Sequence, residues 1–321
     1  MGDVRDVLVI GGNRYFGKRL IDRLTAAGDR ITVLNRGSAP PPAGTIHLVA
    51  DRDDEAALNS ALGDRTFDVV VDQVCYTPRQ AEIARRVFGG GRTRRYVMTS
   101  TVEVYEYEDS IVHVREDAVD PRTVPVDLQL PWHDPEFRDA HYGEGKRQAE
   151  AVFAADGTGF PYTAVRVAHV LGGDDDFTGR LDHYTRRIRT GAPIAVPAEN
   201  QPATYIHVEE IADFLFWVAG EDFTGPVNAA SHGLLTTEEL CAAVARHIPD
   251  GRTVFQHVDV GEISPFSFTR SYGMDNSRAA RLGFTFGHVR EWLPRAVAET
   301  LGTGTGMATG TRPGTSVEIG G

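Results

Sequence analysis

The sequence predicts an α/β fold built on a doubly wound parallel sheet, with a smaller, mixed C-terminal region. Short runs of Val, Leu and Ile alternate with segments whose apolar residues recur at helical spacing. Several of these runs are almost continuously β-branched, which is typical of central strands covered on both faces. No segment of the 321 residues repeats, so the alternation indicates one twisted sheet with helices on both sides.

The first unit is a strand, a tight turn, a helix and a second strand. An apolar run at residues 7–10 stops at Gly11 and Gly12, and Gly17 follows five residues later. Helical spacing then continues to residue 27, and residues 30–34 predict the next strand. Glycines allow positive φ, and the start of a helix favours an anion. We therefore expect the pyrophosphate of a dinucleotide here, the alternative being an ordinary turn that uses glycine for its conformation.

The remaining elements follow in order. Apolar runs predict strands at residues 45–50, 67–72, 94–100 and 162–168, and helical spacing predicts helices at 55–62, 78–88 and 141–155. An acidic, proline-containing segment at 108–138 is expected to be a long loop over the carboxyl ends of the strands. Farther on, we expect short strands near Ile194 and Tyr205 and helices at 181–190, 209–219 and 237–248.

This order suggests three parts. We assign residues 1–165 to a dinucleotide-binding domain and 166–300 to a substrate-binding region that is interleaved with the sheet. Residues 301–321 are rich in Gly and Thr and lack an apolar face, so we expect a disordered tail.

Composition limits the classes of function. The net charge of −12 and the pI near 5.4 argue against a general nucleic-acid binder. Cys75 and Cys241 are too few for a disulfide framework, and no signal peptide or membrane-spanning stretch is recognisable, so we expect a cytoplasmic protein without a membrane partner.

Tyr142 and Lys146 are the strongest candidates for chemistry. Residues four apart share one face of a helix, so the phenol and the ammonium should lie side by side. A neighbouring cation favours phenolate and is expected to lower the pKa of the tyrosine. The alternative is that both residues belong to a solvated helix face. The pair follows a predicted strand that ends in Thr99, Ser100 and Thr101.

With these residues in place, the sequence resembles the short-chain dehydrogenases/reductases. The match is to the extended and atypical branch, the NAD-dependent epimerase/dehydratase family, in a subgroup with a Gly-Gly-x-x-x-x-Gly turn. It extends from about residue 7 to 293 and implies a Rossmann-type fold. The motifs are the Gly11–Gly17 turn, Asp51, the segment 96–105, the Tyr142/Lys146 pair, and the segments 205–212 and 274–284.

The resemblance implies a catalytic set. Tyr142 would be the general acid and base, and Lys146 would hold the nicotinamide ribose. Thr101, or alternatively Ser100, would orient the reacting oxygen. For the cofactor, the resemblance implies contacts from the glycine turn (Gly11, Gly12, Asn13, Arg14, Tyr15, Phe16 and Gly17) and from Asp51 and Arg52 after the third strand.

The end of the second strand bears on the choice of cofactor. A carboxylate there would bind the ribose 2′-OH of NAD, whereas a basic residue suits the 2′-phosphate of NADP. The chain has Asn35 and Arg36, so we favour NADP over NAD. Arg14 is expected to lie over the phosphates and to join Arg36. The alternatives are a surface charge for Arg36 and a helix cap for Asp51.

Departures from the family pattern narrow the substrate. Val102 and Glu103 stand where sugar-nucleotide dehydratases have Asp-Glu, so the acid of water elimination is missing. His169 replaces the usual Asn, and Ala203 and Thr204 replace an Arg-Asp pair that binds phosphates. Candidate substrate contacts are Glu103, Trp132, His133 and His169, although packing would explain each of the last three. No Cys/His spacing resembles a zinc site, so no metal is expected.

These observations predict an NAD(P)-dependent oxidoreductase that acts on an alcohol or ketone of a small polar substrate. The first alternative is an epimerase or dehydratase of a sugar or sugar nucleotide, with a recycled cofactor. The second is a nucleotide- or RNA-associated relative without catalysis. A homodimer would be usual for the family.

Overall fold

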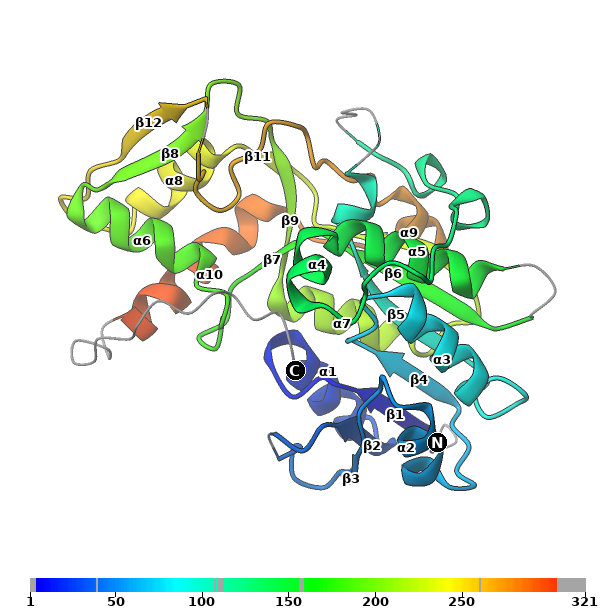
Figure 1. Cartoon of the computed structure of the whole chain (residues 1–321). Coiled ribbons are helices and arrows are strands. Elements are labelled where there is room, and N and C mark those ends of the chain that lie inside the picture. The colour runs from blue at the N-terminus through cyan, green and yellow to red at the C-terminus, as the bar shows by residue number, and fades with distance from the viewer. Residues whose placement is uncertain are drawn as a thin grey trace.

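The computed structural model describes residues 4–38, 40–106, 108, 113–155, 159–259 and 261–304. The chain forms a large sheet covered by helices and a smaller part that carries short strands and three helices (Figure 1).

The central sheet has seven parallel strands in the order β10-β6-β5-β4-β1-β2-β3. The order reverses between β1 and β4, which is where ligands of doubly wound sheets bind. The predicted fold class is confirmed. The strands are β1 (Asp6–Ile10), β2 (Arg30–Asn35), β3 (Ile46–Val49), β4 (Val69–Asp72), β5 (Tyr96–Thr101), β6 (Tyr162–Val167) and β10 (Gly225–Ala229).

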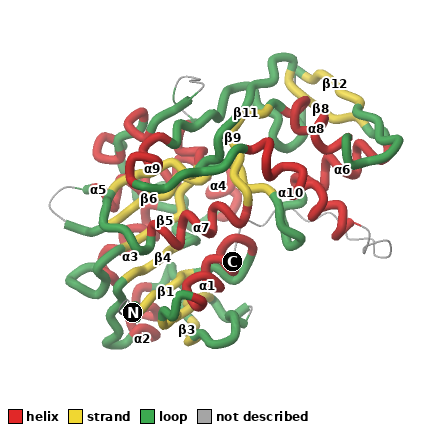
Figure 2. The backbone as a smooth tube through the Cα atoms, turned by 180° about the vertical axis from the view of Figure 1, so that it is seen from behind, coloured by secondary structure: helices red, strands yellow, loops and turns green. Residues whose placement is uncertain are grey.

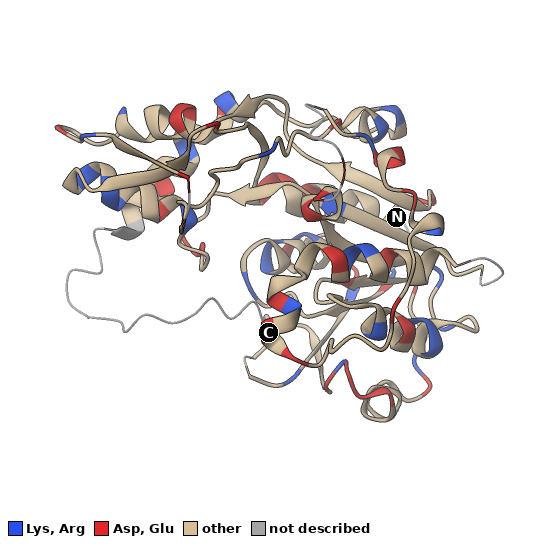
Figure 3. Ribbon diagram, turned by 45° about the horizontal axis from the view of Figure 1, so that its top comes forward, with Lys and Arg blue, Asp and Glu red and all other residues tan. Residues whose placement is uncertain are grey.

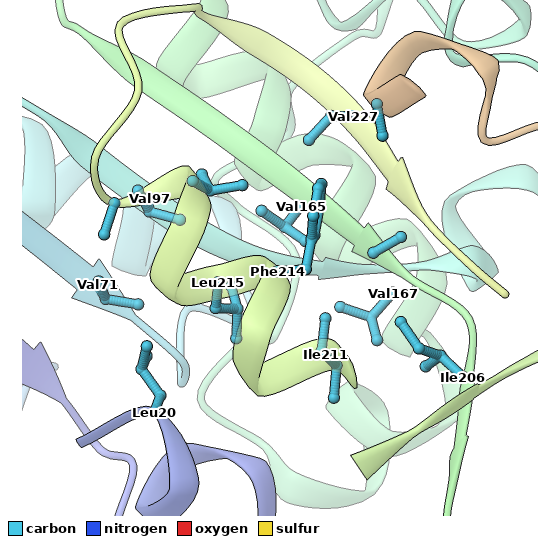
Figure 4. Close-up of a cluster of buried hydrophobic side chains, with 14 of the residues drawn as sticks. Leu20, Val71, Val97, Val165, Val167, Ile206, Ile211, Phe214, Leu215 and Val227 are labelled. Atoms are coloured by element: carbon cyan, nitrogen blue, oxygen red, sulfur yellow. The ribbon is translucent and has the colours of Figure 1, made fainter. Parts of the chain in front are cut away.

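Helices α1 (Tyr15–Ala26) and α7 (Val208–Val218) cover one face of the sheet and lie side by side (Figure 2). Ile211, Phe214 and Leu215 of α7 pack against valines of β5, β6 and β10 (Figure 4). Each fully buried side chain of this size contributes roughly 1.5–3 kcal/mol. The apolar stripe of α7 therefore fixes this face of the sheet below the glycine turn.

Helices α2 (Glu55–Leu62), α3 (Pro78–Phe88) and α5 (Tyr142–Ala154) cover the opposite face. Their starts are specified locally. The Asp54 side chain accepts a hydrogen bond from Ala57 N at 2.9 Å, and Thr77 caps α3, which has Pro78 in its first turn. The sequence-based bounds of α2 and α3 were correct.

The smaller part has its own apolar core. It contains β7 (His169–Leu171), β8 (Pro193–Pro197), β9 (Ala203–His207), β11 (Leu234–Leu235) and β12 (Val254–Val258), with helices α6 (Arg180–Thr190), α8 (Thr237–Ala245) and α10 (Val289–Gly304). A short helix, α9 (Ser277–Leu282), contacts β10. The division at residue 165 stays a prediction: the chain crosses it within β6 and returns to the central sheet with α7 and β10.

Two expectations need correction. The segment 108–138 is not only loop, because it contains short 3-10 turns at Glu116–Ala118 and Pro121–Thr123 and the start of helix α4 (Pro135–Ala140). Two of these segments are specified locally, because Pro121 and Pro135 stand in their first turns and the side chains of Asp120 and Asp134 cap them. The tail was expected to begin at residue 301, but α10 continues to Gly304; residues 305–321 lie outside the described residues.

Basic and acidic residues are interspersed over both parts (Figure 3). Within the described residues, no helix is long and apolar enough to cross a membrane.

Candidate active site

The glycine turn between β1 and α1 is shaped by backbone conformation and close packing. Gly11 and Gly12 both have φ near +80°. A Cβ on Gly17 would lie 2.6 Å from the Gly12 Cα and 2.3 Å from Oε1 of Gln73. The start of α1 thus meets the turn so closely that only glycine fits, which lets the backbone at the helix start come close to a pyrophosphate.

A pocket opens beside this turn at the carboxyl ends of β1, β2 and β3. It includes five of the residues predicted to contact a cofactor, from the glycine turn, the end of β2 and the segment after β3. The residues that line it are Ile10, Gly11, Leu34, Asn35, Arg36, Ala50, Asp51, Arg52, Asp53, Val74, Tyr76, Gln80 and Arg138. Apolar walls with a few polar groups fit an adenosine moiety, so these residues suit a dinucleotide.

Arg52 forms the floor of this pocket through a buried ion pair. Its Nη2 donates to the carboxylate of Asp72, which is fully buried at the end of β4. Asp72 also accepts from the Tyr96 hydroxyl at 2.5 Å and from Val74 N at 2.9 Å. A buried charge pair needs such extra hydrogen bonds to offset its desolvation. Arg52 therefore has a structural partner as well as a place beside the cofactor pocket.

Thr101 and Tyr142 meet at the carboxyl end of β5. The threonine is buried at the end of the strand, and its side chain is hydrogen-bonded with the Tyr142 phenol. Ser100, the alternative to Thr101, donates instead to Glu150 at 2.5 Å, within a buried pair that Glu150 forms with Arg166. Of the two hydroxyls, Thr101 is the one directed at Tyr142.

Lys146 lies one helical turn beyond Tyr142 and is 1% exposed. Its Nζ donates to the carbonyl oxygen of Thr99 at 2.7 Å. It lies 4.5 Å from the ring centre of Tyr76 and 5.8 Å from that of Tyr142. Burial lowers the pKa of the Lys146 ammonium to about 8.

The predicted lowering of the Tyr142 pKa by Lys146 was wrong for this structure. Burial raises the pKa of the phenol well above its ordinary value, although the hydrogen bond with Thr101 and the charge of Arg180 act in the opposite direction. The Lys146 ammonium faces the Thr99 carbonyl and the Tyr76 ring.

Glu103 lies beside the start of α5, where Tyr142 stands. The Glu103 carboxyl is hydrogen-bonded with the Tyr272 hydroxyl, and burial raises its pKa. The chain turns closely here, since a Cβ on Gly143 would lie 2.5 Å from the Glu103 carbonyl oxygen. Glu103 is thus close to the catalytic candidate, as the sequence suggested.

His169 begins β7 inside a set of aromatic rings. Its imidazole stacks on Phe268 at 4.9 Å between ring centres and lies 5.5–5.9 Å from three others, Phe266, Tyr272 and Tyr205. Burial lowers its pKa to about 3, so the imidazole is neutral. Its buried Nε2 has no hydrogen-bond partner among the described residues.

The remaining candidates differ in position, and Trp132 lies near α5, 3.2 Å from where a Cβ on Gly145 would be. Trp132 is buried, donates to the Asp127 carbonyl oxygen at 2.8 Å and packs on Phe137, whereas His133 is exposed. Arg14 is exposed, with its guanidinium 5.9 Å from the Phe177 ring centre rather than beside Arg36 in the pocket. Their predicted contacts with substrate or cofactor stay predictions.

Sequence reasoning missed three groups near the site. Gln73 reaches the glycine turn, Tyr76 covers Lys146, and Arg180 lies within electrostatic range of Tyr142, Glu103 and His169. Gln73 and Tyr76 follow a buried strand, which is a usable signal. Arg180 has no such signal.

A model of the NAD-dependent epimerase/dehydratase family matches residues 7–230, which include the glycine turn and the Thr101, Tyr142 and Lys146 positions. The chain belongs to this family. Members of this family are enzymes, and the Rossmann-type fold and the order of the strands agree with that assignment. In the described residues, no cluster of three or more His, Cys, Asp or Glu side chains is arranged to hold a metal ion.

The chain is similar to three proteins of known name or structure. It is 24% identical to a chloroplast stem-loop binding protein of 41 kDa from Arabidopsis thaliana, over 90% of this chain and 75% of that protein. It superposes on UDP-glucose 4-epimerase from Thermotoga maritima, solved with UDP-glucose, with a TM-score of 0.70, 17% identity and coverage of 93% and 99%. UDP-glucose 4-epimerase from Thermus thermophilus, solved with NAD, gives a TM-score of 0.66, 18% identity and coverage of 92% and 99%.

Proposed function

We propose that this protein is an NAD(P)-dependent oxidoreductase that transfers hydride at an alcohol or ketone carbon of a small polar substrate. The observation that carries the proposal is the Thr101–Tyr142 hydrogen bond, with Lys146 one helical turn away, across the carboxyl edge of the sheet from the glycine turn. A bound nicotinamide would supply or accept the hydride.

The side chains divide the remaining work. Thr101 would hold the reacting oxygen in line with the Tyr142 hydroxyl, which gives its proton to the oxygen in reduction and takes it back in oxidation. A raised pKa keeps Tyr142 protonated in the free protein, which suits proton donation during ketone reduction. Lys146, with a lowered pKa, would hydrogen-bond the cofactor ribose and place a positive charge near the developing alkoxide.

An epimerase is the second candidate, because two structural relatives carry that name and one of them was solved with NAD. In an epimerase, the same Tyr142 would remove and return the proton while the cofactor stays bound. His169, Ala203 and Thr204 depart from the residues that bind sugar-nucleotide phosphates in the family, which favours the reductase. Cofactor that survives dialysis of the purified protein would favour the epimerase, whereas turnover of added NADPH would favour the reductase.

An RNA-associated role is the third candidate and rests on the name of the chloroplast relative. The net charge of −12 and the interspersed charges in Figure 3 argue against it. A stem-loop RNA that binds the wild type and the Tyr142→Phe variant with the same affinity would support it.

The Tyr142→Phe variant tests the catalytic proposal. Removing one hydroxyl should lower turnover by about 100- to 10,000-fold while cofactor affinity changes little, because the ring remains in place. Tyr162→Phe is the matched control, since Tyr162 lies at the opposite, amino end of β6. Turnover of the Tyr142→Phe variant at the wild-type rate would refute the role of this phenol.

We also propose NADP as the preferred cofactor, with Arg36 binding the 2′-phosphate from the end of β2. Fluorescence titration should give a lower Kd for NADPH than for NADH. Arg36→Ala should weaken NADPH binding about tenfold or more and leave NADH binding almost unchanged. Arg14→Ala should affect both cofactors equally if Arg14 contacts the shared pyrophosphate. Equal affinities in the wild type would overturn the preference.

A further inference from the structure

Arg180, at the start of α6, has a guanidinium without a fixed partner. The side chain is only partly exposed and lies 5.6 Å over the ring of Phe266. No hydrogen bond or ion pair of this guanidinium occurs within the part of the chain that the structure describes. The other arginines of α6 differ in their surroundings: Arg186, for example, is exposed and paired with Asp182 at 2.9 Å.

Arg180 and His169 lie against the same ring, that of Phe266, at 5.6 Å for the guanidinium and 5.5 Å between ring centres. Its charge acts on the Tyr142 phenol, on Glu103 and on His169, so all three lie within electrostatic range. The guanidinium comes from the smaller part of the chain, whereas Tyr142 belongs to a helix that packs on the central sheet. The group of side chains therefore joins the two parts at the reacting position.

Neighbouring carboxyl groups do not neutralise this charge. Glu103 is held by the Tyr272 hydroxyl, and Asp176 accepts hydrogen bonds from Thr178 N at 2.9 Å and from its hydroxyl at 2.6 Å. Neither forms an ion pair with Arg180. Burial also raises the pKa of both carboxyl groups.

His169 supplies a second, independent observation. The residue is 7% exposed, and its Nε2 has no partner among the described residues although it is a polar atom in an aromatic environment. Such an atom costs stability unless a ligand satisfies it. An arginine without a counter-ion and a neutral imidazole without a partner together form the donor set of an anion site.

We propose that Arg180 and His169 form a subsite for an anionic group of the substrate, a carboxylate or a phosphoryl group, next to the reacting carbon. This inference rests on the proposed function, because it assumes that the substrate reacts at Tyr142. Arg180 would bind the anionic oxygens in two parallel hydrogen bonds, and Nε2–H of His169 would donate a third. The substrate class is then an oxo or hydroxy acid, or a phosphorylated ketone or alcohol, rather than a neutral one.

Small anions test the subsite without turnover. The protein, saturated with the cofactor that binds more tightly, is titrated with malonate, with inorganic phosphate and with neutral malonamide. The imidazole signal of His169 is followed by NMR and assigned by its absence in His169→Gln. We expect a saturable shift with malonate or phosphate and none with malonamide. Comparison of the two anions distinguishes a carboxylate site from a phosphoryl site.

Variants then identify the arginine. Arg180→Gln should weaken anion binding by about tenfold to a hundredfold, whereas Arg180→Lys should keep part of it. Arg186→Gln, on the same helix, should bind like the wild type. No shift with either anion, an equal shift with malonamide, or unchanged affinity in Arg180→Gln would overturn the proposal. The Tyr142→Phe variant should still bind the anion. Anion binding therefore tests the subsite, and turnover of Tyr142→Phe tests hydride transfer independently.

Discussion

The two sides of the candidate site differ in how their catalytic and charged groups are held. On the central sheet, Lys146 donates to a backbone carbonyl, Arg52 is paired with Asp72, and Thr101 is hydrogen-bonded with Tyr142. On the smaller part, Arg180 has no ion-pair partner and the buried His169 Nε2 has no hydrogen-bond partner, again among the described residues. The cations of one side are held by the protein before any ligand binds, whereas the cation of the other side can be paired by a ligand.

This difference has a physical meaning. Groups that act on every substrate, such as the acid and base and the cofactor contacts, gain from being fixed in advance, because no reorganisation is needed at the reacting carbon. Groups that select a substrate gain from being left unpaired, because a ligand without the matching acceptors leaves them unsatisfied. We infer that the central sheet supplies the reaction and that the smaller part supplies the specificity.

The largest expected effect is on cofactor affinity, at Gly17, where the backbone of α1 packs most closely against the glycine turn. Gly17→Ala places a methyl group 2.6 Å from the Gly12 Cα and 2.8 Å from its carbonyl oxygen, so α1 must move away from the turn. We expect cofactor affinity, measured by fluorescence titration, to fall by at least about 100-fold, and stability to fall by roughly 1–3 kcal/mol. Gly220→Ala is the control, because its added Cβ would lie 3.4 Å from the Trp217 carbonyl oxygen, which is an ordinary van der Waals contact. Wild-type affinity in Gly17→Ala would show that the turn is not organised in advance.

The burial of Lys146 predicts a pH-dependent effect on stability. Its pKa is about 8 in the folded protein against an ordinary value of 10.5, so the unfolded chain binds the proton more tightly. The wild type should therefore gain about 3 kcal/mol relative to Lys146→Met as pH rises from 8 to 10.5, and nothing below pH 8. Urea unfolding at several pH values measures the difference. The other lysine of the chain, the exposed Lys18, serves as the control through Lys18→Met. A difference that stays constant with pH would contradict the lowered pKa.

The same contrast explains which features of the structure could be predicted from the sequence. Strands and helices of the sheet were predictable because their apolar periodicity is local, and α2 and α3 carry Asp54 and Thr77 as caps and Pro78 in the first turn. The Tyr142/Lys146 pair was predictable for a similar reason, since four residues on one helix define one face. Tyr142 and Thr101 meet because parallel strands and the following helices bring their carboxyl edges together.

The other side of the site depends on contacts that are distant in sequence. His169, Arg180 and Phe266 are brought together by the packing of β7, α6 and a loop almost a hundred residues later. No local pattern encodes such a meeting, and an arginine at the start of a helix has many possible surroundings. The error on the Tyr142 pKa has the same origin, because the spacing placed Lys146 nearby but did not reveal that Thr99 and Tyr76 would engage its ammonium.

The smallest expected effect is that of His169→Leu, which should raise the stability of the protein and lower its affinity for an anion. His169→Leu nearly conserves volume and removes a buried nitrogen that has no partner within the described residues, so the free energy of unfolding should rise by about 1 kcal/mol. The same variant should bind malonate or phosphate more weakly, because it loses one donor. Urea unfolding measures the first quantity and calorimetric titration of the cofactor-loaded protein the second, with the exposed His133→Leu as the control. A loss of stability larger than 1 kcal/mol would mean that the imidazole is already satisfied in the folded protein, and the two sides of the site would then not differ in the way that their hydrogen bonds indicate.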